Sequence, residues 1–259
     1  MERLPASAGI DWIRQGFALF RKQPAELSML FLLYMLLMFS LSLIPLLGSL
    51  LPLLLMPAFS MAFMQACVDI TAQRKVRPGV LLTAFRSPAL GSLLRLGVLY
   101  MLAAIAAIAA SAVIDGGVFW KLLSGQIKPD SEAVASSNLP VAMLFSALIY
   151  LPFAMGFWHA APLITWQRMT LFKAVFYSFF AVRRCGKAFL LYALGWFIIG
   201  FIAPLFIGSV LGLLVGKTML GVLLPMLLVP MSVIFTLAMY CSFYPTYTAV
   251  FNPPEPQRS

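Results

Sequence analysis

The sequence is poor in charged residues, and this shortage excludes an ordinary soluble fold. Charged residues make up 10% of the 259 residues, whereas 62% are hydrophobic. A soluble domain carries about 25% charged residues, which cover its surface. A chain this apolar needs lipid around it, so we expect an integral membrane protein.

The residues that catalysis and metal binding require are also scarce. His159 is the only histidine, and Cys67, Cys185 and Cys241 form no C-x-x-C pair. No G-x-S-x-G, H-E-x-x-H or phosphate-loop motif occurs. Acid–base catalysis inside a membrane needs paired titratable groups, and the apolar segments hold none besides His159. We therefore predict that the protein is not an enzyme, uses no cofactor or metal, and keeps its cysteines as free thiols.

Uncharged stretches set the number of membrane spans. A helix needs about 20 such residues to cross roughly 30 Å of hydrocarbon. Turn residues between 45 and 52 divide the first stretch, 27–68, into two crossings. We predict one all-α membrane domain over residues 1–259, a six-span transmembrane helical bundle. Its spans are expected at about 27–47, 51–70, 93–114, 140–166, 187–213 and 220–249.

Positive charge is distributed in a way that predicts orientation rather than nucleic-acid binding. The N-terminal segment, the 69–95 loop, the 167–187 loop and the C-terminal tail hold 15 of the 18 Lys and Arg residues. Cytoplasmic loops are enriched in these residues. We expect both termini in the cytoplasm and no nucleic-acid partner. The mostly polar start and the missing A-x-A site also predict that no signal peptide is cleaved.

A short motif suggests internal repeats. Leu-Pro-x-Leu-Leu-x-Pro occurs at 51–57 and again at 224–230, where its prolines should bend or break a helix. Amphipathic segments precede the hairpins, for example Phe172, Val175, Phe176, Phe179 and Val182 at helical spacing. We predict three units, about 9–75, 76–169 and 170–250, each an interfacial amphipathic helix followed by a transmembrane hairpin. The alternative is coincidence in a sequence of low diversity, since the middle unit lacks the motif.

Small residues at four-residue spacing indicate helix packing. Gly208, Gly212 and Gly216 form one row, and Ala103, Ala107 and Ser111 form a smaller one. The glycine row can pack spans within one chain or join two chains, and we favour packing within the chain.

Two sets of polar residues are candidates for a site. Gln65 and His159 follow prolines at similar distances, so they are predicted at similar depths. One possibility is that they contact a substrate or lipid headgroup. The other is that they form hydrogen bonds between helices, and we favour this second interpretation. The second set consists of cations near helix ends, which attract anionic lipid or only set topology. These cations are Arg21, Lys22, Arg86, Arg183, Arg184 and Lys187.

The segment 9–24, followed by Ile44-Pro45-Leu46-Leu47-Gly48 and Pro57, resembles a known family. This is a proteobacterial family of polytopic inner-membrane proteins with no assigned activity. The segment is more distantly similar to the membrane domain fused to some glycerophosphoryl diester phosphodiesterases. The resemblance is strongest over residues 9–75 and implies an inner-membrane location and a link to lipids. The soluble phosphodiesterase domain is absent, so that activity is not expected.

Two functions remain open. One is a non-enzymatic scaffold or regulator that binds membrane lipids, such as anionic phospholipid, or another membrane protein. The other is a transporter or flippase-like protein for an amphipathic or lipidic substrate. A central cavity lined by Gln65, His159, Tyr240 and Tyr244 indicates transport, whereas a tightly packed centre indicates a scaffold. We favour the scaffold.

Overall fold

The computed structural model describes residues 4–44, 48, 50–215 and 217–251. In this part of the chain, six helices are long and apolar enough to cross a membrane, and no strand is present. They are Pro24–Ser42, Leu51–Thr71, Leu90–Asp115, Leu139–Thr165, Gly186–Leu214 and Gly221–Thr248. Each coincides closely with a predicted span. The predicted all-α, six-span class is therefore confirmed.

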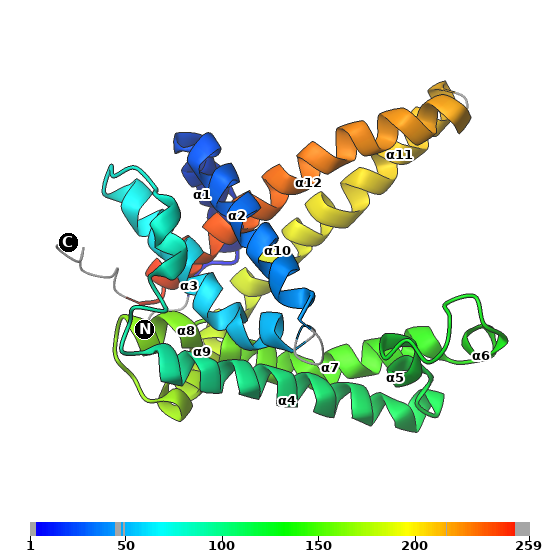
Figure 1. The fold of residues 1–259 in the computed structure, drawn as a ribbon, viewed down its shortest axis with the longest axis horizontal. Helices are drawn as coiled ribbons and strands as arrows, with labels where there is room; N and C mark the ends of the chain where they lie inside the picture. Colours follow the sequence, from blue (N-terminus) through cyan, green and yellow to red (C-terminus); the bar gives the residue numbers. More distant parts are fainter. Residues whose placement is uncertain (1–3, 45–47, 49, 216, 252–259) are drawn as a thin grey trace.

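Three helical hairpins make up most of the structure. The first pairs α2 (Pro24–Ser42) with α3 (Leu51–Thr71), and the second pairs α4 (Leu90–Asp115) with α7 (Leu139–Phe157). In the third, α10 (Gly186–Phe197), a π-helical turn (Ile198–Ile202) and α11 (Ala203–Leu214) form one span beside α12 (Lys217–Thr248). The second and third hairpins project in different directions from a common base (Figure 1). The hairpins are thus splayed and do not pack together over their whole length.

Helix α3 forms the centre of this base. Of the six candidate spans it is the most buried, whereas the Gly186–Leu214 span has no buried residue in its most apolar window. Phe59 and Phe63 of α3 are buried against Tyr34 of α2, with ring centroids 5.3 and 5.5 Å from that of Tyr34. Both Leu-Pro segments stay helical, because α3 continues through Pro57 and α12 through Pro225 and Pro230. The prolines therefore do not break these helices, and a bend at them stays a prediction.

The smaller predicted row of small residues lies between α4 and α7. Ala103, Ala107 and Ser111 are buried on α4, and Ala142 and Ser146 are buried on α7. Short side chains at these positions let two helix backbones approach closely over a long stretch. The row thus explains why this pair stays together far from the base.

Helix α1 (Ala8–Lys22) is part of the packed core. Its buried face packs against α10 and α12, and Trp12 is only 2% exposed. A Cβ atom at Gly16 would lie 2.5 Å from the Ala238 carbonyl oxygen and 2.6 Å from the Cβ of Ser242. Only glycine allows this approach. The amphipathic pattern of α1 therefore reflects contact with the third hairpin.

Helix α9 (Leu171–Arg184) presents two different faces. It packs on α7 and on α8 (Ala160–Thr165) through small residues, Ala174, Ser178 and Ala181, together with Val182. Phe172 and Phe176, two of the residues noted at helical spacing, are exposed, as is Phe180. Rings that stand outward on an amphipathic helix are suited to lipid.

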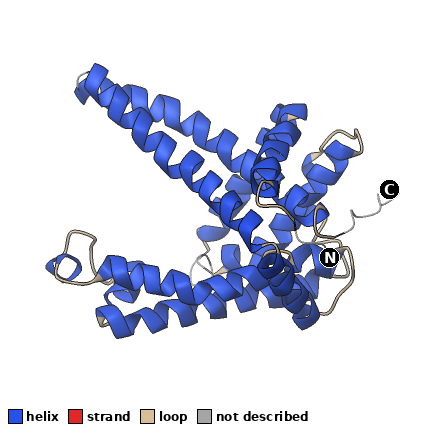
Figure 2. Cartoon of the chain, turned by 180° about the vertical axis from the view of Figure 1, so that it is seen from behind, coloured by secondary structure: helices blue, strands red, loops and turns tan. Residues whose placement is uncertain are grey.

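Short elements connect the hairpins, and the loops between helices are brief except near 124–138 (Figure 2). A 3-10 helix, η1 (Pro78–Leu82), precedes α4 and contacts α2 and α3. Between α4 and α7 lie α5 (Val118–Leu123) and α6 (Glu132–Ala135). The Asp115 carboxylate accepts the backbone N–H groups of Gly117 (2.8 Å) and Phe119 (2.6 Å), which starts α5.

Candidate functional site: two basic cavities and an aromatic centre

A polar cavity on the charge-rich side has a volume of about 930 Å³. It lies between the second half of α3, the 79–92 segment and the 164–169 segment that ends α8. Gln65 and Arg86, which the sequence assigned to separate sets, both line it, together with Arg168. The fold therefore joins one predicted polar residue and one predicted lipid-binding cation in a single cavity.

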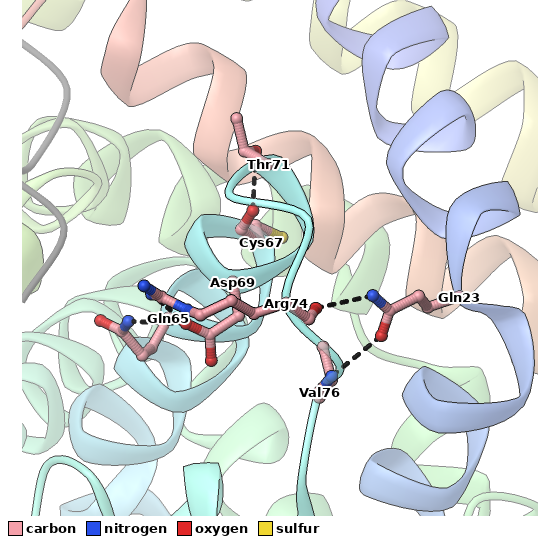
Figure 3. Close-up of polar contacts among 7 residues, drawn as sticks. All are labelled: Gln23, Gln65, Cys67, Asp69, Thr71, Arg74 and Val76. Atoms are coloured by element: carbon pink, nitrogen blue, oxygen red, sulfur yellow. Dashed lines mark hydrogen bonds and ion pairs between the residues drawn. The ribbon is translucent and has the colours of Figure 1, made fainter. Parts of the chain in front are cut away.

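A polar network holds the wall of this cavity (Figure 3). The Gln65 side-chain amide donates to Asp69 at 3.4 Å, and Arg74 donates to the same Asp69 oxygen at 2.6 Å. Gln23, at the junction of α1 and α2, donates to the Arg74 carbonyl at 2.7 Å and accepts the Val76 N–H at 2.9 Å (Figure 3). The loop that follows α3 is thus fixed at both ends.

Two arginines at the cavity have no acidic partner. Among the described residues, neither Arg86 nor Arg168 forms a salt bridge, and Asp69, which bonds to Gln65, is paired with Arg74. The backbone of Arg168 has φ +50°, a left-handed conformation that residues with a Cβ seldom adopt. The cavity is therefore electropositive and includes a locally strained cation.

His159 lies elsewhere, at the break between α7 and α8. Its ring is 1% exposed and is surrounded by Phe189, Tyr247 and Phe251, with centroids 5.5 to 6.0 Å away. The Nε2 atom has no hydrogen-bond partner, while the backbone N–H donates to Ser178 at 2.9 Å. The structure does not bring His159 and Gln65 into one site.

A second basic cavity, of about 1040 Å³, lies beside α9 and the start of α10. Three predicted lipid contacts, Arg183, Arg184 and Lys187, line it together with the rings of Phe176 and Phe180. The other two, Arg21 and Lys22, are exposed at the end of α1 and line neither basic cavity. The predicted cations thus fall into three separate places.

The centre of the molecule holds a smaller cavity, of about 300 Å³, with aromatic walls. Tyr34, Tyr100, Tyr150 and Tyr240 contribute from four different helices. Phe63 stacks on Tyr240 with ring centroids 4.4 Å apart. Of the four residues expected in a transport cavity, only Tyr240 is here. No sequence spacing links tyrosines on four helices, which is why the sequence did not reveal this cavity.

A comparison with known proteins agrees with this architecture. A probable inner membrane protein of Burkholderia thailandensis is 38% identical over 260 residues, covering 97% of this chain and 93% of that protein. The chain belongs to its family of inner membrane proteins. No family model and no solved structure matches the sequence. The inner-membrane part of the resemblance is confirmed, and the distant similarity to phosphodiesterase membrane domains stays a prediction.

An inner-membrane location accounts for the apolar surface of this protein. Leu213 and Val113 are 88% and 86% exposed near the ends of the third and second hairpins. Such side chains contact lipid when the hairpins lie in a bilayer. The splayed shape therefore gives each hairpin a large lipid-facing surface.

The predicted glycine row lies on this same surface of the inner membrane protein. A Cβ atom added at Gly208 would lie 3.5 Å from the nearest atom of the Leu224 side chain. Gly212 is exposed. Gly216 lies outside the described residues. A Cβ at Gly208 would meet no backbone of another helix within 4 Å, and a packing role for the row stays a prediction.

No metal site is evident in the described residues, since no three His, Cys, Asp or Glu side chains come together there. The cavities described above are lined by arginines, amides and aromatic rings. The two basic cavities suit anions, and the aromatic centre suits an uncharged group.

Proposed function

We propose that this inner membrane protein is a non-enzymatic scaffold or regulator that binds anionic phospholipid on its cytoplasmic face. The observation that carries the proposal is the cavity beside α9. Arg183, Arg184 and Lys187 line it together with Phe176 and Phe180, which are 60% and 47% exposed. Cations next to a bilayer attract anionic lipids by about 1 kcal/mol each, and exposed rings insert among the lipids.

The charge distribution supports this orientation. With 15 of 18 Lys and Arg residues on one side, that side is expected to be cytoplasmic. The cytoplasmic leaflet carries a negative surface potential. Helix α9 and the three cations then face the lipids to which they are complementary.

The contacts of the interfacial elements support three repeats. Each such element packs on the preceding hairpin: η1 on α2 and α3, and α9 on α7 and α8. Helix α1 has no preceding hairpin and instead packs on α10 and α12 of the last one. This closes a ring of three units, about 9–75, 76–169 and 170–250.

A triple substitution tests the lipid proposal. Arg183→Gln, Arg184→Gln and Lys187→Gln together are expected to lower the phosphatidylglycerol and cardiolipin that co-purify, measured by lipid mass spectrometry. The matched control is Lys75→Gln, Arg77→Gln and Arg95→Gln, which removes the same charge from the same side but lines neither basic cavity. Equal lipid content in the two triple variants would reduce the α9 cations to topology markers.

Transport is the second candidate, and the aromatic cavity of about 300 Å³ favours it. Its volume lies at the lower end of known ligand pockets, about 300–1,000 Å³. In vesicles, a scaffold should move fluorescent phospholipid between leaflets no faster than protein-free vesicles do. Faster movement that disappears in Ala154→Phe, which fills the cavity, would favour the transporter instead.

A further inference from the structure

We infer that the cavity of about 930 Å³ between α3, the 79–92 segment and α8 is a binding site for a phosphate ester. Arg86 and Arg168 reach this cavity from segments far apart in the sequence. Neither forms a salt bridge among the described residues, and Asp69, the hydrogen-bond partner of Gln65, is paired with Arg74 at 2.6 Å. Two cations at one cavity repel each other, and an anion between them relieves that repulsion. Guanidinium groups bind phosphate oxygens with two parallel hydrogen bonds.

The remaining polar groups at the cavity complement an anion. Thr83 and Ser92 line it and carry hydroxyl groups that can donate to an anion. The cavity also borders the N-terminus of α4, a helix of 26 residues. The Leu90 and Ser92 N–H groups are paired within this first turn, so it is the helix dipole that favours negative charge at this end.

The backbone of Arg168 gives independent support. Its φ of +50° is an uncommon conformation that glycine would adopt freely. Strained residues persist where the surrounding structure holds them, and they cluster at ligand sites. The left-handed backbone at Arg168 sets the direction of the chain at the point where the Arg168 side chain lines the cavity. A role in folding alone does not require a cation here.

The other walls indicate what is attached to the phosphate. Met61, Ile164, Trp166 and Met169 line the cavity beside the polar groups. An apolar wall next to two arginines fits a phosphate ester with an amphipathic organic part. That ligand is either a phospholipid headgroup or a soluble phosphate ester. The site is built on elements other than α9, so it can fail or succeed independently of the lipid scaffold.

Four variants test the site. Arg86→Gln and Arg168→Gln each remove one guanidinium. Arg95→Gln is the matched control, because Arg95 is exposed on α4 and does not line the cavity. Arg168→Gly removes the cation and relieves the positive φ, so its melting temperature should not fall below that of wild type. This variant separates loss of binding from loss of folding.

Two arms distinguish the sources of the ligand. In phosphatidylcholine nanodiscs, inorganic phosphate and glycerol 3-phosphate are titrated by calorimetry. In parallel, native mass spectrometry compares retention of phosphatidylglycerol with that of phosphatidylcholine. The site is supported if wild type and Arg95→Gln bind in either arm and binding is about ten-fold weaker in Arg86→Gln, Arg168→Gln and Arg168→Gly. The arm in which binding occurs then identifies the ligand as a soluble phosphate compound or a phospholipid. No binding in either arm, or equal binding by all variants, overturns the proposal.

Discussion

At the scale of single residues, glycines set the closest contacts between helices. A Cβ at Gly9 would strike the Ala188 carbonyl, and one at Gly97 would strike the Leu54 carbonyl. Gly16 tests the contact between α1 and α12, because its neighbours are backbone atoms and a Cβ atom on α12, which no change of rotamer can move. The contact between α1 and the third hairpin therefore depends on the absence of a side chain.

Gly16→Ala should lower the free energy of unfolding by about 1–3 kcal/mol, the usual effect of overpacking. The control is Gly91→Ala in α4, where a Cβ would meet nothing within 4 Å. That change should leave the melting temperature in detergent unchanged or raise it, because alanine favours helix. If both variants melt at the same temperature, α1 does not pack on α12 as described.

Gln23 offers a second test at this scale, because its side-chain amide forms hydrogen bonds with Arg74 and Val76 in the loop after α3. Gln23→Leu should destabilise the loop by about 1 kcal/mol, since two hydrogen bonds are lost at a partly exposed site. Hydrogen exchange at Val76 should become faster. Gln15→Leu, an exposed position on α1 with no side-chain hydrogen bond in the structure, should leave that exchange rate unchanged.

The prediction that His159 lies in one site with Gln65, based on their similar distances from a preceding proline, is wrong. The pairing with Gln65 assumed a continuous helix after Pro152, whereas α7 ends at Phe157 and α8 begins at Ala160. The break turns His159 toward Phe189, Tyr247 and Phe251 and away from the cavity that holds Gln65. Pro162 has no N–H to bond to the Trp158 carbonyl four residues earlier, so a signal of this break was present in the sequence and was not used.

At the scale of elements, the spans were predictable and the partners of the amphipathic helices were not. Uncharged runs fix the spans because lipid excludes charge. An amphipathic pattern only shows that one face is apolar. In α1 that face packs on protein through Gly9 and Gly16, whereas in α9 the exposed face carries Phe172 and Phe176. Buried glycines on α1 were the one available clue to the difference.

The start of α5 depends on a single carboxylate. Asp115→Ala removes the acceptor for the Gly117 and Phe119 N–H groups and should destabilise α5 by about 0.5–2 kcal/mol. Hydrogen exchange should then accelerate at Phe119 and leave α4 unaffected. Asp130→Ala, in an exposed turn of the same connection, is the control. Unchanged exchange at Phe119 would mean that α5 forms without its cap.

At the scale of the whole molecule, the cavities arise from segments that the sequence does not relate. The wall with Gln65, Arg86 and Arg168 draws on three elements, and the aromatic centre draws on α2, α3, α4, α7 and α12. Patterns within a segment predict which face of a helix is buried. They do not predict how splayed hairpins meet at their base, because that depends on packing between units.

The orientation of the molecule is the last prediction. Six spans place both termini on one side, and that side holds 15 of the 18 Lys and Arg residues. Because such loops are retained in the cytoplasm, reporters at the N-terminus and the C-terminus should be active only as cytoplasmic fusions. A reporter inserted at residue 130, between α5 and α6, should be active only outside the cytoplasm. An external signal from either terminus would reverse the topology, and the basic cavities would then face the periplasm.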